Sequence, residues 1–203
     1  MAKNRDWNGN KNSLFKTLGA SNHTDKERQN QDYYATEPAA AEWLLKLEYF
    51  SGRDIWECAS GENHLANVFK GAGYTVRTSD IVQRTPDTEV LDFLTCKEKW
   101  RGHIITNPPY NKAKGFVEKA LDLVDDGKKV CMFLKVQFLE GKARRKLFDT
   151  NPPRTIWVSS SRLLCAKNAK FEEMRAGGGS AVAYAWFVWE KGYKGDTVVK
   201  WFN

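Results

Sequence analysis

The sequence predicts an α/β protein whose mostly parallel sheet carries helices on both faces. Short runs of β-branched and aromatic residues alternate along the chain with stretches of helical periodicity, as expected for parallel strands joined by crossover helices. The run Lys129–Val136 has the composition of a buried strand, and Ala181–Trp189 is wholly apolar, which is typical of strands covered on both sides. The length of 203 residues suits one such domain.

Local signals define the elements in the first half of the chain. Pro38 opens an Ala-rich helix, because proline suits the first helical turn, and Glu37 lies near the positive end of the helix dipole. Gly71 and Gly73 end a later helix. In chain order we expect a helix over 38–49, a strand over 55–58, a helix over 64–70, a strand over 74–78 and a short strand or turn over 90–94.

The second half follows the same alternation. Ile104, Ile105 and Thr106 favour a strand. The next helix, over 113–124, places five apolar residues on one face: Phe116, Val117, Ala120, Leu121 and Val124. We then expect a strand over 129–136, a helix over 141–148, strands over 155–159 and 181–189, a Gly-containing turn and a tail over 198–202.

The stretch with the most specific chemistry is Asn107-Pro108-Pro109-Tyr110. Neither proline has an N–H, so the preceding strand must stop at Asn107, and these four residues stand at its carboxyl end. Ligands of open α/β sheets bind at that end. The Asn107 carboxamide and the Pro108 carbonyl are acceptors on a stiff backbone, and Tyr110 is a stacking surface, which suits a planar group with an amino nitrogen. A second Asn-Pro-Pro, beginning at Asn151, lacks the aromatic residue and is predicted to be a helix stop and turn.

Other strand ends carry acids and a glycine turn. Glu57 ends the first strand and is followed by Gly61, a residue that lets a ligand approach the backbone closely. Asp80 ends the second strand, where an acid typically binds ribose hydroxyls, and Asp92 follows at the next junction. Acids at strand ends are often merely solvated, but this order predicts a nucleoside site beside an amine acceptor. Neither a Gly-x-Gly-x-x-Gly dinucleotide motif nor a P-loop is present.

The composition indicates which kind of partner the protein binds and in which compartment it resides. The net charge is +7 and the isoelectric point is near 9.2, which favours a polyanionic partner. The four cysteines lack any Cys-x-x-Cys spacing, so we expect buried free thiols in a reducing cytoplasm. The three histidines form no metal-ligand pattern, and no apolar run approaches the roughly 20 residues of a membrane span. Residues 1–31 are expected to be a flexible basic arm, or a solvated tail without function, ahead of a single domain over 32–203.

The motifs together resemble those of the S-adenosylmethionine-dependent DNA adenine-N6 methyltransferases, most closely the small enzymes of bacteriophage and prophage. The resemblance runs from about Asn22 to the C-terminus. It implies a Rossmann-like class I methyltransferase fold and a catalytic motif of Asn107, Pro108, Pro109 and Tyr110. The cofactor residues that it implies are Tyr34, Thr36, Glu57, Ala59, Gly61, Asp80, Ile81, Asp92, Phe93 and Asn107. Where the family usually has a second glycine this chain has Asn63, a residue type that tolerates left-handed backbone.

The resemblance implies methyl transfer to the N6 amine of an adenine that has left the DNA duplex. Asn107 and Pro108 would accept hydrogen bonds from the amine, and Tyr110 would stack on the base. A short recognition insertion near 162–180 would take the place of a large target-recognition domain. Basic residues are dense from Gly141 to Arg175, and the expected nucleic-acid contacts are Lys112, Arg144, Arg145, Lys146, Arg162, Lys167 and Lys170.

Three alternatives stay open at this stage. The basic cluster could be a solvated helix face. The substrate could be an exocyclic amine of RNA or a protein glutamine, because Asn-Pro-Pro-Tyr serves methyltransferases of both kinds. The chain could also be a nucleic-acid-binding module without catalysis, which cofactor binding would distinguish. The sequence indicates neither the DNA site nor the oligomeric state.

Overall fold

The computed structural model describes residues 34–167, 169–177 and 182–203. The predicted arm over 1–31 and parts of the 162–180 insertion lie outside these residues. Within them the main sheet has eight strands in the order β10-β7-β9-β6-β5-β2-β3-β4. The strands are β2 (Asp54–Glu57), β3 (Thr75–Asp80), β4 (Glu89–Val90), β5 (His103–Thr106), β6 (Lys129–Lys135), β7 (Thr155–Ser159), β9 (Tyr184–Glu190) and β10 (Val198–Phe202).

One strand runs against the others. Strand β9 pairs antiparallel with both β6 and β7, whereas the other neighbours in the sheet pair in parallel. An antiparallel strand brings its amino end to the edge where parallel strands end. Tyr184, the first residue of β9, therefore pairs with Lys135 at the end of β6.

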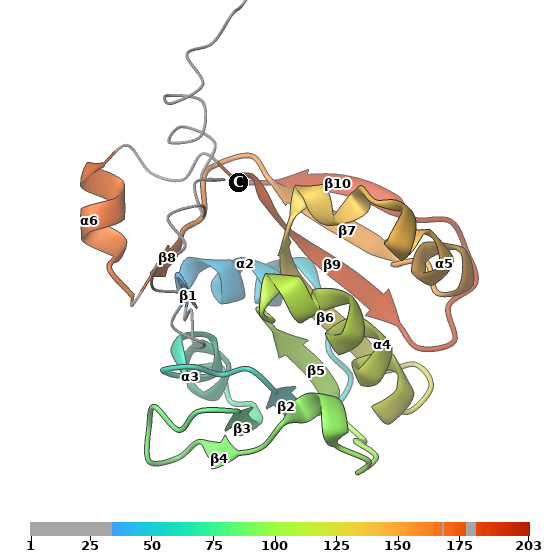
Figure 1. The fold of residues 1–203 in the computed structure, drawn as a ribbon, viewed down its shortest axis with the longest axis horizontal. Helices are drawn as coiled ribbons and strands as arrows, with labels where there is room; N and C mark the ends of the chain where they lie inside the picture. Colours follow the sequence, from blue (N-terminus) through green and yellow to red (C-terminus); the bar gives the residue numbers. More distant parts are fainter. Residues whose placement is uncertain (1–33, 168, 178–181) are drawn as a thin grey trace, which may run out of the picture.

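Helices cover both faces of the sheet, which confirms the predicted layers (Figure 1). The helices are α2 (Ala39–Leu47), α3 (His64–Gly71), α4 (Ala113–Leu123), α5 (Lys142–Thr150) and α6 (Phe171–Ala176). Helices α2 and α3 pack on the face that carries Ile105 and Phe133. Helices α4 and α5 pack on the opposite face, with Ile104 and Met132. Because side chains alternate along a strand, one apolar run supplies both cores.

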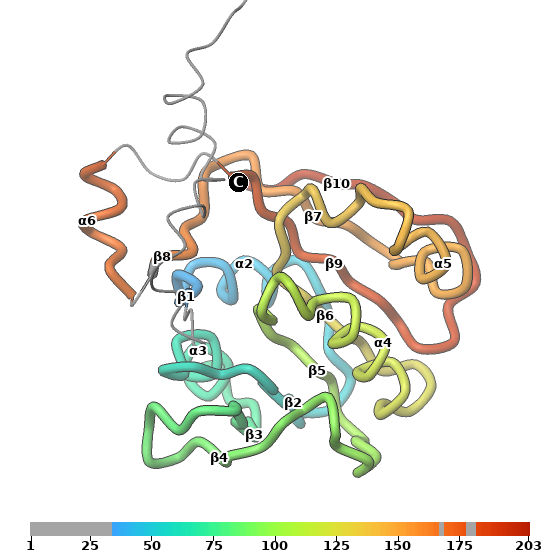
Figure 2. Tube along the Cα trace, viewed as in Figure 1, coloured from blue at the N-terminus to red at the C-terminus, as the bar shows by residue number. Residues whose placement is uncertain are grey.

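A second, two-stranded sheet lies beside the main one. Strand β1 (Tyr34–Thr36) pairs antiparallel with β8 (Cys165–Lys167), and the pair lies near α2 and α3 in the chain trace of Figure 2. Glu37 fastens this pair, because its backbone N–H donates to the Leu164 carbonyl and its Oε2 accepts from the Leu164 N–H, each at 3.0 Å. The start of the predicted insertion is thus attached to the start of the described chain.

Most predicted elements are present, and the differences have local causes. The expected tail over 198–202 is the edge strand β10, paired in parallel with β7. Its Val, Trp and Phe residues favour a strand, but four of its five residues are exposed, so no alternating burial marks it. The short strand near residue 90 is β4, and a 3-10 helix over Phe93–Thr95 follows, begun by Asp92, whose side chain accepts from the Leu94 N–H. All four cysteines are buried free thiols, as predicted. No helix in these ranges is long and apolar enough to cross a membrane.

Candidate active site

The predicted site residues converge where neighbouring parallel strands end. Strand β2 pairs with β3 on one side and with β5 on the other. Glu57 and Asp80 end the first two of these strands, and Asn107 directly follows the third. The carboxyl ends of parallel neighbours meet at one edge, so side chains about 23 to 50 positions apart in the chain surround one region.

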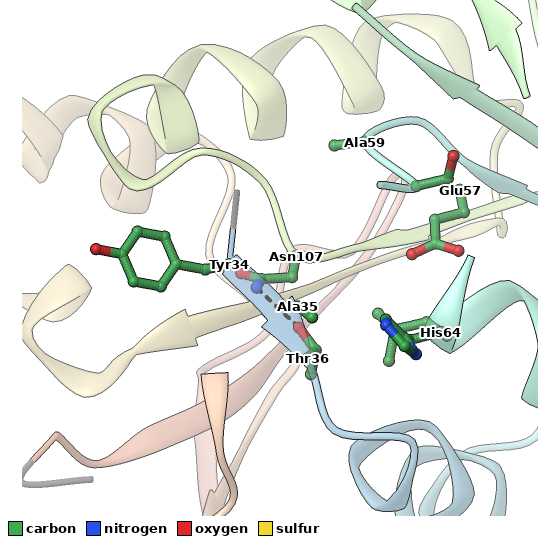
Figure 3. Close-up of a pocket in the computed structure, with 9 residues that line it drawn as sticks. Tyr34, Ala35, Thr36, Glu57, Ala59, His64 and Asn107 are labelled. Carbon is green, nitrogen blue, oxygen red and sulfur yellow. Dashed lines mark hydrogen bonds between the residues drawn. The ribbon is translucent and has the colours of Figure 1, made fainter. Parts of the chain in front are cut away.

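Two adjoining clefts open at this edge. The inner cleft lies between β1 and the start of α3 and is shown in Figure 3. Its lining consists of Tyr34, Ala35, Thr36, Glu57, Ala59, Ser60, His64, Leu65 and Asn107. The outer cleft has an empty volume of about 370 Å³ and is lined by Cys58, Ala59, Asp80, Ile81, Leu91, Asp92, Phe93, Pro109, Lys112 and Phe116. Both clefts include Ala59, so one elongated ligand could occupy the two together.

The side chain of Asn107 has one satisfied end and one unsatisfied end. Its Nδ2 donates to Thr36 Oγ1 at 2.8 Å, as the dashed line in Figure 3 shows, and lies 3.8 Å from Cys165 Sγ. Its Oδ1 is buried and has no hydrogen-bond partner. Buried acceptors in proteins are nearly always paired. An unpaired amide oxygen on a residue that lines the inner cleft is therefore an acceptor available to a ligand N–H.

Tyr110 belongs to a cluster of three tyrosines. Its hydroxyl donates to that of Tyr184 at 3.3 Å, and its ring lies 6.4 Å from that of Tyr34. The ammonium of Lys135 stands 4.7 Å from the centre of the Tyr110 ring. Burial raises the pKa of the Tyr110 phenol well above its usual range, so the ring stays neutral. Tyr110 thus offers an uncharged aromatic surface next to a cation.

Glu57 is a buried carboxylate without enough partners. It is 2% exposed, and its Oε2 accepts no hydrogen bond. Burial raises the pKa of Glu57 well above its ordinary value; the Ala66 amide opposes this rise, and the nearby charge of Asp80 adds to it. Figure 3 shows the carboxylate directed towards His64 on the inner cleft. A cationic ligand group there would supply the missing partner.

The turn between β2 and α3 depends on two left-handed residues. Gly61 has a φ of 53° and Asn63 a φ of 65°. The Gly61 N–H donates to Asp80 Oδ2 at 2.9 Å, so the end of β3 holds the turn in place. The Asn63 amide bonds to Thr85 and Thr88, at 2.7 and 3.3 Å. Asn63 therefore adopts the conformation that a glycine would, and adds side-chain contacts that glycine lacks.

The remaining predicted cofactor residues line the outer cleft. Ile81 is 59% exposed there, and Phe93 is 1% exposed between the rings of Trp56 and Phe116. Asp92 Oδ1 accepts from the Leu94 N–H at 3.0 Å. The oxygens of Asp80 also accept from the Val82 N–H and lie 3.6 Å from Arg84. A carboxylate has about four acceptor positions, so both acids keep capacity for ligand hydroxyls.

The predicted nucleic-acid residues do not form one patch. Lys112 lines the outer cleft, close to the Asn-Pro-Pro-Tyr sequence. Arg145 and Lys146 are exposed on α5, which Figure 1 shows far from β8 and α6. Arg162 and Lys170 are exposed on the segment around those two elements, and Lys167 is the last residue of β8. Among the members of this set whose side chains the structure describes, Lys112 alone lines one of the two clefts.

Arg144 links its own helix to the turn that precedes it. Its Nε donates to the Phe138 carbonyl at 2.7 Å, and its guanidinium lies 5.0 Å from the Phe138 ring. Further donations reach the carbonyls of Gln137 and Glu140. Arg144 therefore ties α5 to the preceding 3-10 turn (Val136–Leu139), a role that charge counting along the sequence could not reveal.

Among the residues of the site that the sequence analysis missed are His64, Lys135, Cys165 and Tyr184. His64 directly follows the glycine turn, and a predicted helix start next to that turn was the available signal. Cys165 and Tyr184 had no such signal. They reach the site because β8 pairs with β1 and because β9 runs antiparallel to β6. Burial raises the pKa of the Cys165 thiol to about 11, so it is neutral at physiological pH.

Sequence comparison and structure comparison give different results for this chain. No family model and no curated protein sequence matches it. Among solved structures, an S-adenosylmethionine-dependent O-methyltransferase from Thermotoga maritima is 13% identical, with a TM-score of 0.54 over 83% of this chain and 70% of that one. The type IIG restriction endonuclease BpuSI is 15% identical, with a TM-score of 0.56 over 81% of this chain but only 26% of its own.

A third similar structure comes from Pyrococcus horikoshii and has been assigned as an RNA methyltransferase. It is 12% identical, with a TM-score of 0.53 over 76% of this chain and 82% of that chain. At such identities the likeness establishes architecture alone. The predicted fold class is confirmed: the chain has the Rossmann-like α/β fold of the class I S-adenosylmethionine-dependent methyltransferases.

Proposed function

We propose that this protein transfers a methyl group from S-adenosylmethionine to the N6 amine of adenine in DNA. The observation that carries the proposal is the Asn107 Oδ1, a buried and unpaired acceptor beside two adjoining clefts. It belongs to an Asn-Pro-Pro-Tyr sequence at the end of β5. A site built around such an acceptor suits an N–H donor, which an exocyclic amine supplies.

The clefts fit the two halves of S-adenosylmethionine. Asp80, Asp92 and the apolar Ile81 and Phe93 suit an adenosine in the outer cleft. The unpaired Glu57 suits the ammonium of the methionine part in the inner cleft. When bound, S-adenosylmethionine supplies an electrophilic sulfonium methyl group.

The catalytic task of the chain is to prepare the amine. The lone pair of an adenine amine is delocalised into the ring, so the nitrogen is a poor nucleophile. Two acceptors, Asn107 Oδ1 and the Pro108 carbonyl, favour a pyramidal nitrogen whose lone pair is free to attack. Fixed acceptors of this kind need no reorganisation during the reaction, and positioning completes the effect. No general base is needed beforehand, because the amine becomes acidic only after it is methylated.

Nucleic acid suits the surroundings of this site better than a small molecule does. The net charge is +7, and Lys112 and Lys135 stand beside the Asn-Pro-Pro-Tyr motif. A base flipped out of the duplex would stack on Tyr110, which contributes about 1–3 kcal/mol per base. The shared fold of BpuSI, a restriction endonuclease, agrees with DNA as the substrate. The segment around β8 and α6 is the proposed recognition insertion.

An amine of RNA is the second candidate substrate. The match to the structure from Pyrococcus horikoshii, which has been assigned as an RNA methyltransferase, covers 82% of that chain. The match to BpuSI covers only 26%, so the RNA methyltransferase is closer in size to this protein. A single-stranded or bulged base would reach Tyr110 at lower cost than a base stacked in duplex DNA.

Methylation with labelled cofactor tests the proposal directly. The full chain is incubated with radiolabelled S-adenosylmethionine and, separately, with duplex DNA, single-stranded DNA, structured RNA and a protein extract. The products are hydrolysed and separated. We expect the label in N6-methyladenine from DNA. Label in an RNA nucleoside or in glutamine would show that the substrate is RNA or protein instead of DNA. Cofactor binding in calorimetry without any methyl transfer would indicate a binding module that lacks catalysis.

A further inference from the structure

The catalytic amide of Asn107 has two orientations that differ in chemistry but not in shape. Its oxygen and nitrogen exchange places when the group turns by half a revolution, and only one orientation points an acceptor at the substrate. In the structure the Nδ2 faces Thr36 and Cys165, which leaves Oδ1 unpaired. Some other group must favour this orientation, since a free amide would populate both.

Thr36 alone does not decide the orientation. Its Oγ1 lies 2.8 Å from Nδ2, but a hydroxyl can accept from an amide nitrogen or donate to an amide oxygen. In the turned amide, Thr36 would donate to Oδ1 and occupy the acceptor that the reaction needs. The direction of the Thr36 hydroxyl proton therefore matters.

Cys165 supplies the missing bias. Its Sγ lies 3.9 Å from Thr36 Oγ1 and 3.8 Å from Asn107 Nδ2, and both Cys165 and Thr36 are buried beside the partly exposed Asn107. A sulfur atom is a weak acceptor, but this one is placed to accept both the Thr36 hydroxyl proton and the second proton of the Asn107 amide. With Cys165 Sγ as the acceptor of the Thr36 proton, the hydrogen bonds run one way, from Asn107 Nδ2 to Thr36 Oγ1 and from Thr36 Oγ1 to Cys165 Sγ. This arrangement leaves Oδ1 facing the clefts.

We infer that Thr36 and Cys165 are positioning residues that set the orientation of the catalytic amide. The inference rests on the proposed methyl transfer and adds to it a role for β1 and β8. Because Cys165 belongs to β8 and the neighbouring Leu164 is held by Glu37, the segment proposed to recognise nucleic acid also fixes the catalytic acceptor. A substrate that displaced β8 would weaken the acceptor, so recognition and catalysis share one hydrogen-bond chain.

The test compares Thr36→Val with Thr36→Ser. Valine keeps the shape and removes the hydroxyl, whereas serine keeps the hydroxyl. Single-turnover methylation at saturating cofactor should slow by about 10- to 100-fold in Thr36→Val, the cost typical of losing a partner that orients a metal ligand, which is a comparable task. Thr36→Ser should restore most of the rate. Cys165→Ala should slow methylation by a smaller factor. An unchanged Thr36→Val rate, or a weaker cofactor affinity with an unchanged rate, would overturn the inference.

Thr106→Val is the matched control. Thr106 is fully buried next to Asn107, and its hydroxyl has no hydrogen-bond partner. The same substitution there should leave the methylation rate unchanged, with melting temperatures reported for every variant. Equal slowing in Thr36→Val and Thr106→Val would attribute both effects to packing and contradict the inference.

A second background separates orientation from any general effect of Thr36. In Asn107→Asp the carboxylate presents an oxygen whichever way it turns, so orientation no longer matters. Thr36→Val should then cost much less in Asn107→Asp than in the native background. An equal cost in both, or an Asn107→Asp variant without any activity, counts against the inference. Absence of methyl transfer by the unaltered protein would instead contradict the proposed function itself.

Discussion

Asn107 and Asn151 provide a comparison at the residue scale, because both begin an Asn-Pro-Pro sequence. Asn107 keeps an unpaired acceptor at the clefts, whereas the exposed Asn151 ends α5 and its backbone carbonyl accepts from Trp189 Nε1 at 3.0 Å. The same three residues thus serve a candidate active site in one place and a helix end in the other. Surrounding structure, rather than the tripeptide, gives Asn107 its chemistry.

Asn107→Ala should lower the methylation rate constant by about 100- to 1000-fold, the usual cost of losing one preorganised group that acts in the transition state. Cofactor affinity should change little, because the proposed role of the amide is to act on the amine in the transition state. Asn151→Ala should be nearly silent, since its backbone carbonyl remains. Steady-state kinetics and thermal melts of both variants measure this. Equal activity in the two variants would mean that the first copy is an ordinary turn.

If Glu57 binds the ammonium of the cofactor as proposed, cofactor binding should depend on pH. Burial raises its pKa, so the carboxyl group of the free protein holds its proton to a higher pH than an exposed glutamate does. An ammonium needs the ionised form, so affinity for S-adenosylmethionine should rise as the pH passes up through this pKa, with release of a proton on binding. Calorimetry in buffers of different ionisation enthalpy measures both effects.

Glu57→Gln is the control for this dependence. The variant should bind the cofactor more weakly and with little dependence on pH below neutrality. At higher pH the variant should also be more stable to unfolding than the native protein. The native group has a raised pKa, and the stability that it contributes at low pH is lost as the pH rises through that value. Cofactor binding by Glu57→Gln that equals the native binding would remove Glu57 from the ammonium site.

At the scale of elements, the basic residues of α5 have two different roles. Arg144 holds the helix to the preceding turn through backbone carbonyls, whereas Arg145 pairs only with Asp149 in its own helix, at 2.7 Å. Lys146 is exposed beside them. Reversal of Arg144 should therefore act mainly on stability, and reversal of its two neighbours on any bound polyanion.

Replacing both Arg145 and Lys146 by Glu should raise the KM for DNA and flatten its salt dependence, while the melting temperature and the cofactor affinity stay near the native values. Each lost phosphate contact lowers the logarithmic salt slope by roughly 0.9. Replacing both Lys97 and Lys99 by Glu is a control of equal charge change, because these exposed residues lie on the segment that leads into β5 rather than on α5. Equal effects of the two pairs would mean that the net charge of the protein, rather than a contact on α5, determines DNA binding.

The stability of the whole molecule should depend on His103, which joins three segments. His103 is 1% exposed, accepts from the Lys129 N–H through Nδ1 at 2.9 Å, and has its Nε2 3.0 Å from the Ser51 carbonyl. Burial lowers the pKa of His103 from 6.5 to about 4, and the charges of Lys128 and Lys129 contribute, although the bond to Ser51 opposes the change. Only the neutral ring can make both contacts.

The free energy of unfolding should therefore fall as the pH drops from about 6.5 towards 4, since a lowered pKa contributes stability that is complete above the unfolded value. Urea unfolding at pH 7, 6 and 5 measures this before most carboxylates titrate. His103→Gln should be less stable than the native protein at pH 7, but its free energy of unfolding should change less across this pH range. A native curve as flat as that of the variant would contradict the role of His103.

The sequence alone established the α/β class, the layers and the strand ends where the site lies. Apolar runs, Pro108 with Pro109, and the glycines are local signals, and each acts on its own neighbours in the chain. For the same reason the left-handed Asn63 could be anticipated, and the structure has it at a φ of 65°. Glu57, Asp80 and Asn107 were identifiable because each stands where a predicted strand ends.

Only the tertiary structure decided what those residues contact. Asn107 meets Thr36 across 71 positions, and Thr36 meets Cys165 across 129. These contacts depend on the pairing of β1 with β8, while the place of Tyr184 beside Tyr110 depends on the reversed direction of β9. No local pattern specifies strand pairing or direction, because both result from how distant apolar faces pack together. The unpaired oxygen of Asn107 is a consequence of that packing.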